Sequence, residues 1–422
     1  MIRRFLHNFF TRLSTAILSF GVVWLTARYL GAAGRGAVSL FVTDTAALLL
    51  FTGLLGGSSL IYLAPRRNVW HLLLPAYVWA MLVCTFGVTV VAGLRQPPLA
   101  YLGHLAGISL LQAFFSINTL LLLGRRREKA YNLLSVLQVL LLAGLLWGAF
   151  SARAAWISID TYYAVSYLSY GLPWGLSFWW LLRLPDRREQ SRRLRAVTRE
   201  LARHSRGAHL SNILGFANYR LSYYFVAHFA DARALGILSV GVALAEAIWL
   251  IPRSTALLQY VDLVNAPDGS HFPPAAQRAA RLTLLATVGA LLVLASLPTA
   301  FITEVFGPEF GPARGVILLL APGVLAAAVQ MLISSYFAGL ARYAVNNFAA
   351  LLGLIVTLLG CTLLIPRFGI RGAALASTFS YLASTGLLLW RFRQATDAGP
   401  GAFLPRVADL SAGWNLLRQR LR

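Results

Sequence analysis

The sequence predicts an all-α integral membrane protein with about twelve transmembrane helices in two six-helix bundles. Hydrophobic residues make up 58% of the 422 residues and charged residues only 12%. A soluble domain of this composition would have too little polar surface. Apolar stretches long enough to cross a hydrocarbon core of about 30 Å, which takes about 20 residues, recur almost from end to end. A stretch of the first half also matches one in the second half.

The alternate loops differ in charge. Most Lys and Arg residues fall at the amino terminus and in every second connecting segment, and cytoplasmic loops carry such an excess. Both termini are therefore expected in the cytoplasm. The start, MIRRFLHNFF, resembles a signal peptide, but no small-residue cleavage site follows, so we interpret it as part of an uncleaved first helix. The expected spans are 8–28, 37–63, 71–94, 100–123, 131–151, 161–184, 207–229, 235–260, 278–301, 313–338, 345–365 and 371–392.

A polar, basic segment separates the sixth span from the seventh. Its residues Leu194, Val197 and Leu201 recur at helical spacing, which predicts a cytoplasmic surface helix. The expected domains are an N-terminal bundle at 1–185, this linker helix at 186–204, a C-terminal bundle at 205–395 and a cytoplasmic C-terminal segment at 396–422.

An internal repeat supports two halves. ARYLGAAGRGAVSLFVTDTAA at 27–47 aligns without gaps with AHFADARALGILSVGVALAEA at 227–247. An offset of six spans gives both halves the same orientation in the membrane, and a substrate cavity is then expected between them. The identical pairs include Ala27/Ala227, Gly36/Gly236, Ser39/Ser239, Val42/Val242 and Ala47/Ala247.

Arg220 inside the seventh span is the strongest candidate for substrate binding. An ionisable side chain at the centre of a span costs roughly 2.5 to 3.5 kcal/mol, so it marks a water-filled path or a partner within the bundle. A guanidinium stays charged and its donors fit phosphate oxygens. Pairing with an acid, without a substrate role, is the alternative. Asp44 and Glu246 lie near equivalent points of the repeat, for proton or sodium coupling or for charge pairing.

Two further arginines are candidates for the same cavity. Arg12 would lie at its cytoplasmic mouth, or extend to the membrane interface. Arg253 follows Pro252, whose ring disturbs a helix locally, and this break either opens the cytoplasmic end or serves packing. Candidate sugar platforms are Tyr219, Tyr223, Tyr224 and Trp249, although aromatic residues are common at membrane interfaces for other reasons.

The sequence lacks the motifs of disulfide-rich proteins, zinc sites and P-loop ATPases. Cys84 and Cys361 are the only cysteines, both in apolar segments, so we expect neither a disulfide framework nor a zinc site. There is no HExxH and no GxxxxGK[ST], and we expect no metal, no cofactor and no ATP hydrolysis by a P-loop. The net charge of +23 follows the loops, so anionic membrane lipids are the expected contact and nucleic acid is not.

Three segments carry a resemblance to a family. They are LTARYLGAAGRGAVSLF, SNILGFANYRLSYYFVAHFADARALGILSVGVALAEAIWLIPRS and LLIPRFGIRGAALASTFSYL. They resemble the bacterial polysaccharide-biosynthesis proteins, the Wzx-type oligosaccharide flippases of the MOP superfamily, which also contains the MATE drug exporters. The resemblance implies two six-helix bundles around a central V-shaped cavity. Asn218 and Arg220 match family positions in the seventh span, but Ser222 stands where the family often has aspartate, which favours a free cation at Arg220.

The resemblance also implies a function. A transporter without enzyme activity would move an undecaprenyl-diphosphate-linked oligosaccharide from the cytoplasmic to the periplasmic leaflet of the inner membrane, for O-antigen, capsule or exopolysaccharide. A polysaccharide polymerase or glycosyltransferases would be possible partners. The alternatives are a MATE-like exporter of small molecules, a membrane polymerase or glycosyltransferase, and a scaffold that transports nothing.

Overall fold

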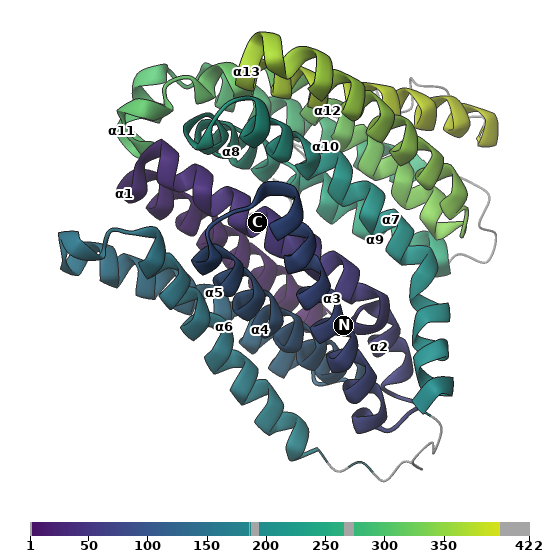
Figure 1. Cartoon of the computed structure of the whole chain (residues 1–422). Helices are drawn as coiled ribbons and strands as arrows, with labels where there is room; N and C mark the ends of the chain where they lie inside the picture. The colour runs from purple at the N-terminus through teal and green to yellow at the C-terminus, as the bar shows by residue number, and fades with distance from the viewer. Residues whose placement is uncertain (1, 185, 187–193, 266–273, 397–422) are drawn as a thin grey trace, which may run out of the picture. The chain divides into compact units, whose positions relative to one another are not determined.

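The computed structural model describes residues 2–184, 186, 194–265 and 274–396, and within these ranges it contains helices and no strand (Figure 1). The expected C-terminal segment, apart from its first residue, lies outside the described residues. The helices are α1 (Ile2–Gly56), α2 (Ser58–Leu63), α3 (Val69–Arg95), α4 (Leu99–Gly124), α5 (Glu128–Ala152), η1 (Ala154–Trp156), α6 (Ile159–Leu182), α7 (Leu194–Phe229), α8 (Ala232–Ala247), α9 (Leu250–Asn265), α10 (Pro274–Ser296), α11 (Thr299–Phe306), η2 (Pro308–Phe310), α12 (Ala313–Gly339) and α13 (Tyr343–Ala395).

The expected spans fall on these helices, although those at 37–63, 235–260 and 278–301 each cross a break between two helices. The all-α, multi-pass membrane class is confirmed. Among the described residues, seven helices are long and apolar enough to cross a membrane, or eight if the bent pair α8 and α9 forms one span. α1 contains the expected span 8–28 and most of the span 37–63, whose last part is α2, and α13 contains the spans 345–365 and 371–392. The two spans are joined at Gly31 (φ 68°) in α1 and at Gly369 (φ 55°) in α13. Glycine adopts positive φ without a steric penalty, so each pair of spans can turn sharply with almost no loop.

The chain divides into two compact units, Met1–Ile213 and Leu214–Arg422. The boundary falls inside α7, a helix that continues from Leu194 to Phe229. The basic linker helix and the seventh span are thus parts of one helix, and the first part is grouped with unit 1. The domain boundaries expected at 185 and 205 remain a prediction.

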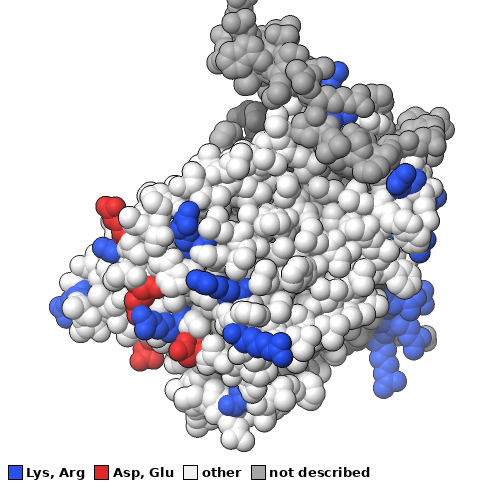
Figure 2. All heavy atoms as spheres, turned by 90° about the horizontal axis from the view of Figure 1, so that it is seen from above, with Lys and Arg blue, Asp and Glu red and all other residues white. Residues whose placement is uncertain are grey.

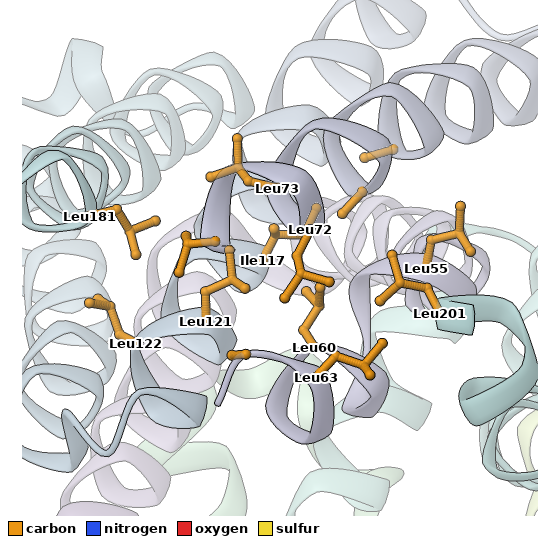
Figure 3. Close-up of a cluster of buried hydrophobic side chains, with 14 of the residues drawn as sticks. Leu55, Leu60, Leu63, Leu72, Leu73, Ile117, Leu121, Leu122, Leu181 and Leu201 are labelled. Carbon is orange, nitrogen blue, oxygen red and sulfur yellow. The ribbon is translucent and has the colours of Figure 1, made fainter. Parts of the chain in front are cut away.

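One apolar cluster of unit 1 explains this grouping (Figure 3). Val197 and Leu201 of α7 are buried against leucines of α1 and α2, including Leu55 and Leu60. Arg67 and Glu200 form an ion pair of 3.1 Å beside the cluster. Val197 and Leu201 of the basic segment therefore pack onto the other helices of unit 1. The sequence predicted this segment as a helix at the membrane surface.

Unit 2 is built around α12, which lies along α13 (Figure 1). Its apolar core contains the wholly buried rings of Tyr336, Phe337 and Phe392. Hydroxyl groups join the two helices, because Thr378 Oγ1 donates to the carbonyl of Leu319 at 2.7 Å and Thr385 Oγ1 donates to Ala326 at 2.9 Å. Such contacts suit a membrane bundle, because helices in lipid associate without a hydrophobic driving force and depend on close packing and interhelical hydrogen bonds.

The described surface fits a bilayer. Figure 2 shows a broad part of one face without charged side chains. Phe86 and Leu292 are examples of large apolar side chains that are mostly exposed. Arginines lie over aromatic rings near helix ends, with Arg66 4.0 Å from the ring of Tyr62 and Arg183 3.8 Å from Trp179. Lipid covers exposed apolar side chains at no cost, and aromatic residues favour the interface.

Replacing Leu201 by alanine is expected to destabilise the protein by about 2 to 5 kcal/mol, because the truncation leaves a cavity in the buried cluster. The measurement is thermal unfolding in detergent. Leu210→Ala on the same helix is the matched control, since Leu210 is half exposed. Equal melting temperatures for the two variants would contradict the packing of α7 on unit 1.

Candidate substrate-binding site

The site in unit 2 begins with a break between α8 and α9. The two helices meet at 46°. Pro252 lacks an N–H and its ring crowds the carbonyl four residues earlier, which belongs to Ile248 at the break. That carbonyl accepts instead from Ile251 at 3.1 Å. The disturbance expected from Pro252 is therefore present, and it leaves Glu246 in the last turn of α8.

Glu246 forms an ion pair with Arg220. Nη1 of Arg220 donates to Oε1 at 3.0 Å and Nη2 donates to Oε2 at 2.9 Å. The side chains remain partly accessible, at 32% for Arg220 and 19% for Glu246. The prediction of a free cation at Arg220 is wrong, because Glu246 of α8 supplies the compensating acid that position 222 lacks. Ser222 itself is buried.

Aromatic rings surround this pair. The rings of Tyr219, Trp249 and Tyr381 contact one another with centroid distances of 5.3 to 5.7 Å. The guanidinium of Arg220 lies 5.3 Å from the ring of Tyr223, within cation–π range. Trp249 is buried and its indole N–H donates to the carbonyl of Val324 in α12 at 3.2 Å. Trp249 and Tyr223 are thus buried and pack within unit 2, while Tyr224 is partly exposed.

Asn218 has a different setting from Arg220. Its Nδ2 donates to the carbonyls of Leu214 and Ala350, at 2.9 and 2.8 Å. Its Oδ1 accepts from Ser380 at 3.3 Å and from Thr357 at 3.5 Å. Positions two apart on a helix do not share a face. Asn218 therefore joins α7 to α13, and the structure does not bring it to the Arg220 pair.

The other two candidate arginines are exposed. Arg253, one residue after Pro252, lies 5.7 Å from the ring of Trp249, which places it next to the break. Arg12 lies on α1 in unit 1. Among the described residues, its hydrogen bond is local: Thr15 Oγ1 donates to the backbone carbonyl of Arg12 at 2.9 Å.

Asp44 is the centre of a separate cluster in unit 1. Its carboxylate is 1% exposed and forms an ion pair with Arg95 at the end of α3. The hydroxyl of Tyr101 donates to Oδ2 at 2.5 Å. Arg95 lies between the expected spans 71–94 and 100–123, so the prediction from charges within spans did not include it. The available signal was its position one residue beyond an expected span, from which a long side chain can reach back into the bundle.

Tyr381 and Ser380 were also missed. Both lie in the last segment that carries the family resemblance, but neither is charged, so the rule that marks charges within spans does not apply to them. No group of three or more His, Cys, Asp or Glu side chains that could hold a metal occurs among the described residues. Cys84 and Cys361 are buried and form no disulfide.

Comparison with solved structures gives the class of the fold. Lipid II flippase MurJ, in its inward closed conformation, matches with a TM-score of 0.64 at 13% identity over 93% of this chain and 88% of that one. An inward-facing multidrug resistance MATE family transporter of the MOP superfamily matches with 0.61 at 12% identity, over 90% and 94%. The eukaryotic MATE transporter AtDTX14 matches with 0.56 at 13% identity, over 92% and 94%.

These three proteins are membrane transporters, and the chain has their fold. The expected resemblance to the MOP superfamily is confirmed at the level of fold. No protein-family model and no curated protein matches the sequence.

Gly353→Ala is expected to disrupt the contact between α7 and α13. A Cβ there would lie 3.0 Å from Asn218 Oδ1 and 3.1 Å from Ser380 Oγ, and closer still to Ser384. Overpacking of this kind costs about 1 to 3 kcal/mol, which lowers the melting temperature in detergent. Gly386→Ala on the same helix meets nothing within 4 Å and should be neutral or stabilising. Tolerance of both substitutions would argue against the close packing around Asn218.

Arg95→Ala is expected to destabilise unit 1 by about 3 kcal/mol, because it leaves the buried carboxylate of Asp44 without its cation. Combining it with Asp44→Asn should recover much of the loss, since the neutral amide needs no counter-ion. Unfolding of the two single variants and the double variant measures this coupling. Strict additivity of the two losses would show that the pair does not interact.

Proposed function

We propose that the chain is a flippase that translocates an undecaprenyl-diphosphate-linked oligosaccharide from the cytoplasmic to the periplasmic leaflet, for polysaccharide biosynthesis. One observation carries the proposal, namely the partly accessible guanidinium of Arg220 on α7, the helix that contains the expected seventh span. Arginine binds phosphate oxygens through parallel hydrogen bonds. The likeness of the fold to a lipid II flippase supports the same class of transport.

A MATE-like exporter of small molecules is the second candidate, because MATE transporters match the fold almost as well. The pairing of the two acids favours the first candidate. Asp44 and Glu246 are each in an ion pair with an arginine. Both oxygens of Glu246 already accept from Arg220, whereas the guanidinium keeps N–H donors that Glu246 does not use. The pair therefore offers more hydrogen bonds to an anion than to a cation.

The membrane potential supplies a driving force for an anionic substrate. A negative charge that leaves a cell with a negative interior gains about 2.3 kcal/mol per 100 mV. In the proposal, export of a diphosphate therefore needs no coupled cation. The described candidate site lies within unit 2, so the proposal depends on no contact between the units.

The location and partners are part of the proposal. The protein would lie in the bacterial inner (plasma) membrane with both termini in the cytoplasm, among anionic lipids and beside a polymerase or glycosyltransferases. Charge asymmetry supports this orientation. Most Lys and Arg residues fall at the amino terminus and in every second connecting segment of the sequence, and few fall in the segments between these. The positive-inside rule describes such a difference between two membrane borders.

The test is the location of lipid-linked oligosaccharide in bacteria that lack the protein. Cells complemented with Arg220→Ala should accumulate the glycan in the cytoplasmic leaflet, as the deletion does, because the diphosphate loses its binding group. Arg391→Ala, an exposed arginine at the end of α13, is the control and should restore export at matched protein level.

Two results would count against the flippase. Normal outward glycan in the deletion strain would contradict it directly. Normal glycan together with increased sensitivity to cationic drugs would favour the MATE-like exporter.

A further inference from the structure

The hydrogen bonds of Arg220 leave one edge of its guanidinium open. A guanidinium has five N–H donors in a planar fork. Two of them donate to the two oxygens of Glu246, and Nη1 also donates to the carbonyl of Tyr219 at 3.3 Å. No described residue accepts a hydrogen bond from Nε. The donors that remain are the Nε–H and one N–H of Nη2, which lie in the guanidinium plane and point in parallel from one edge of it.

This open edge has the geometry that an anion uses. Two parallel N–H donors match two oxygens of one phosphate group. Glu246 holds the opposite part of the fork, which consists of Nη1 and Nη2. The carboxylate and an incoming phosphate would therefore use different donors of the same guanidinium. Binding then requires no separation of the ion pair.

The surroundings hold Glu246 in place. It is in the last turn of α8, three residues before Trp249, whose backbone N–H donates to the carbonyl of Glu246 at 3.0 Å. Trp249 in turn is fixed by its bond to Val324. On the other side, Tyr223 lies against the guanidinium. The backbone that carries the Glu246 carboxylate is thus held by contacts within unit 2. Its hydrogen bonds to Arg220 fix the orientation of the guanidinium.

We propose that Glu246 is a positioning residue of the diphosphate site, which holds the end of the Arg220 fork and presents its Nε–Nη2 edge to one phosphate of the substrate. This inference rests on the proposed function and specifies how the site works. It differs from a model in which Glu246 competes with the substrate for Arg220. Competition predicts tighter anion binding when the acid is removed, and positioning predicts weaker binding.

The experiment is calorimetric titration of the full chain in detergent with farnesyl diphosphate as the probe. Glu246→Ala should weaken binding about tenfold or more, since a charge-assisted pair of hydrogen bonds needs an oriented fork. Glu246→Gln should stay within about threefold of wild type, because its amide oxygen still accepts from one nitrogen of the fork. Arg220→Lys should weaken binding as much as Glu246→Ala although it keeps the charge, because lysine has no paired edge.

The matched control is Glu309→Ala, which removes the acid of an exposed pair with Arg233 and should bind the probe like wild type. Tighter binding by Glu246→Ala or Glu246→Gln would overturn the inference, as would unchanged binding by Arg220→Lys. If Glu246→Ala does not fold, the other two variants decide between positioning and competition. Failure of the wild-type protein to bind farnesyl diphosphate would instead contradict the proposed function.

Discussion

The ion pair between Arg220 and Glu246 determines what the candidate site can bind. An arginine cannot lose its charge in a protein, so within a membrane helix it needs a counter-ion or water. Glu246 supplies the counter-ion from the neighbouring helix. Because the break at Ile248 and Trp249 ends α8, Glu246 lies in the last turn of that helix. The pair therefore makes a permanent cation tolerable in the bundle while part of the guanidinium stays accessible.

Unit 1 uses a similar pair under different conditions. Asp44 is wholly enclosed, and Tyr101 shares one carboxylate oxygen with Arg95. A buried pair of this kind contributes little net stability, but the loss of one partner is costly. The pair in unit 2 is more open at its acid, with 19% exposure against 1%. This difference makes the pair in unit 2 the better candidate for a ligand site and the pair in unit 1 the better candidate for a structural role.

Hydropathy alone predicted the helices well, because membrane spans depend on the composition of about 20 consecutive residues. The site was harder to predict. Arg220 and Glu246 were recognised as charges within spans, but their mutual contact depends on the geometry of the break at Pro252. Arg95 belongs to a helix end and was assigned to a loop. Asn218 was placed with Arg220 because both match family positions in the seventh span, although side chains two positions apart on a helix lie on different faces.

The most direct test of the central claim is translocation of a fluorescent undecaprenyl-diphosphate oligosaccharide in vesicles reconstituted with the purified protein under an imposed membrane potential. The account predicts that wild-type protein accelerates translocation toward the positive side, and that Arg220→Lys is close to protein-free vesicles despite its retained charge. Translocation at the wild-type rate by Arg220→Lys would contradict recognition by the guanidinium edge. A wild-type rate equal to that of empty vesicles would contradict the flippase itself.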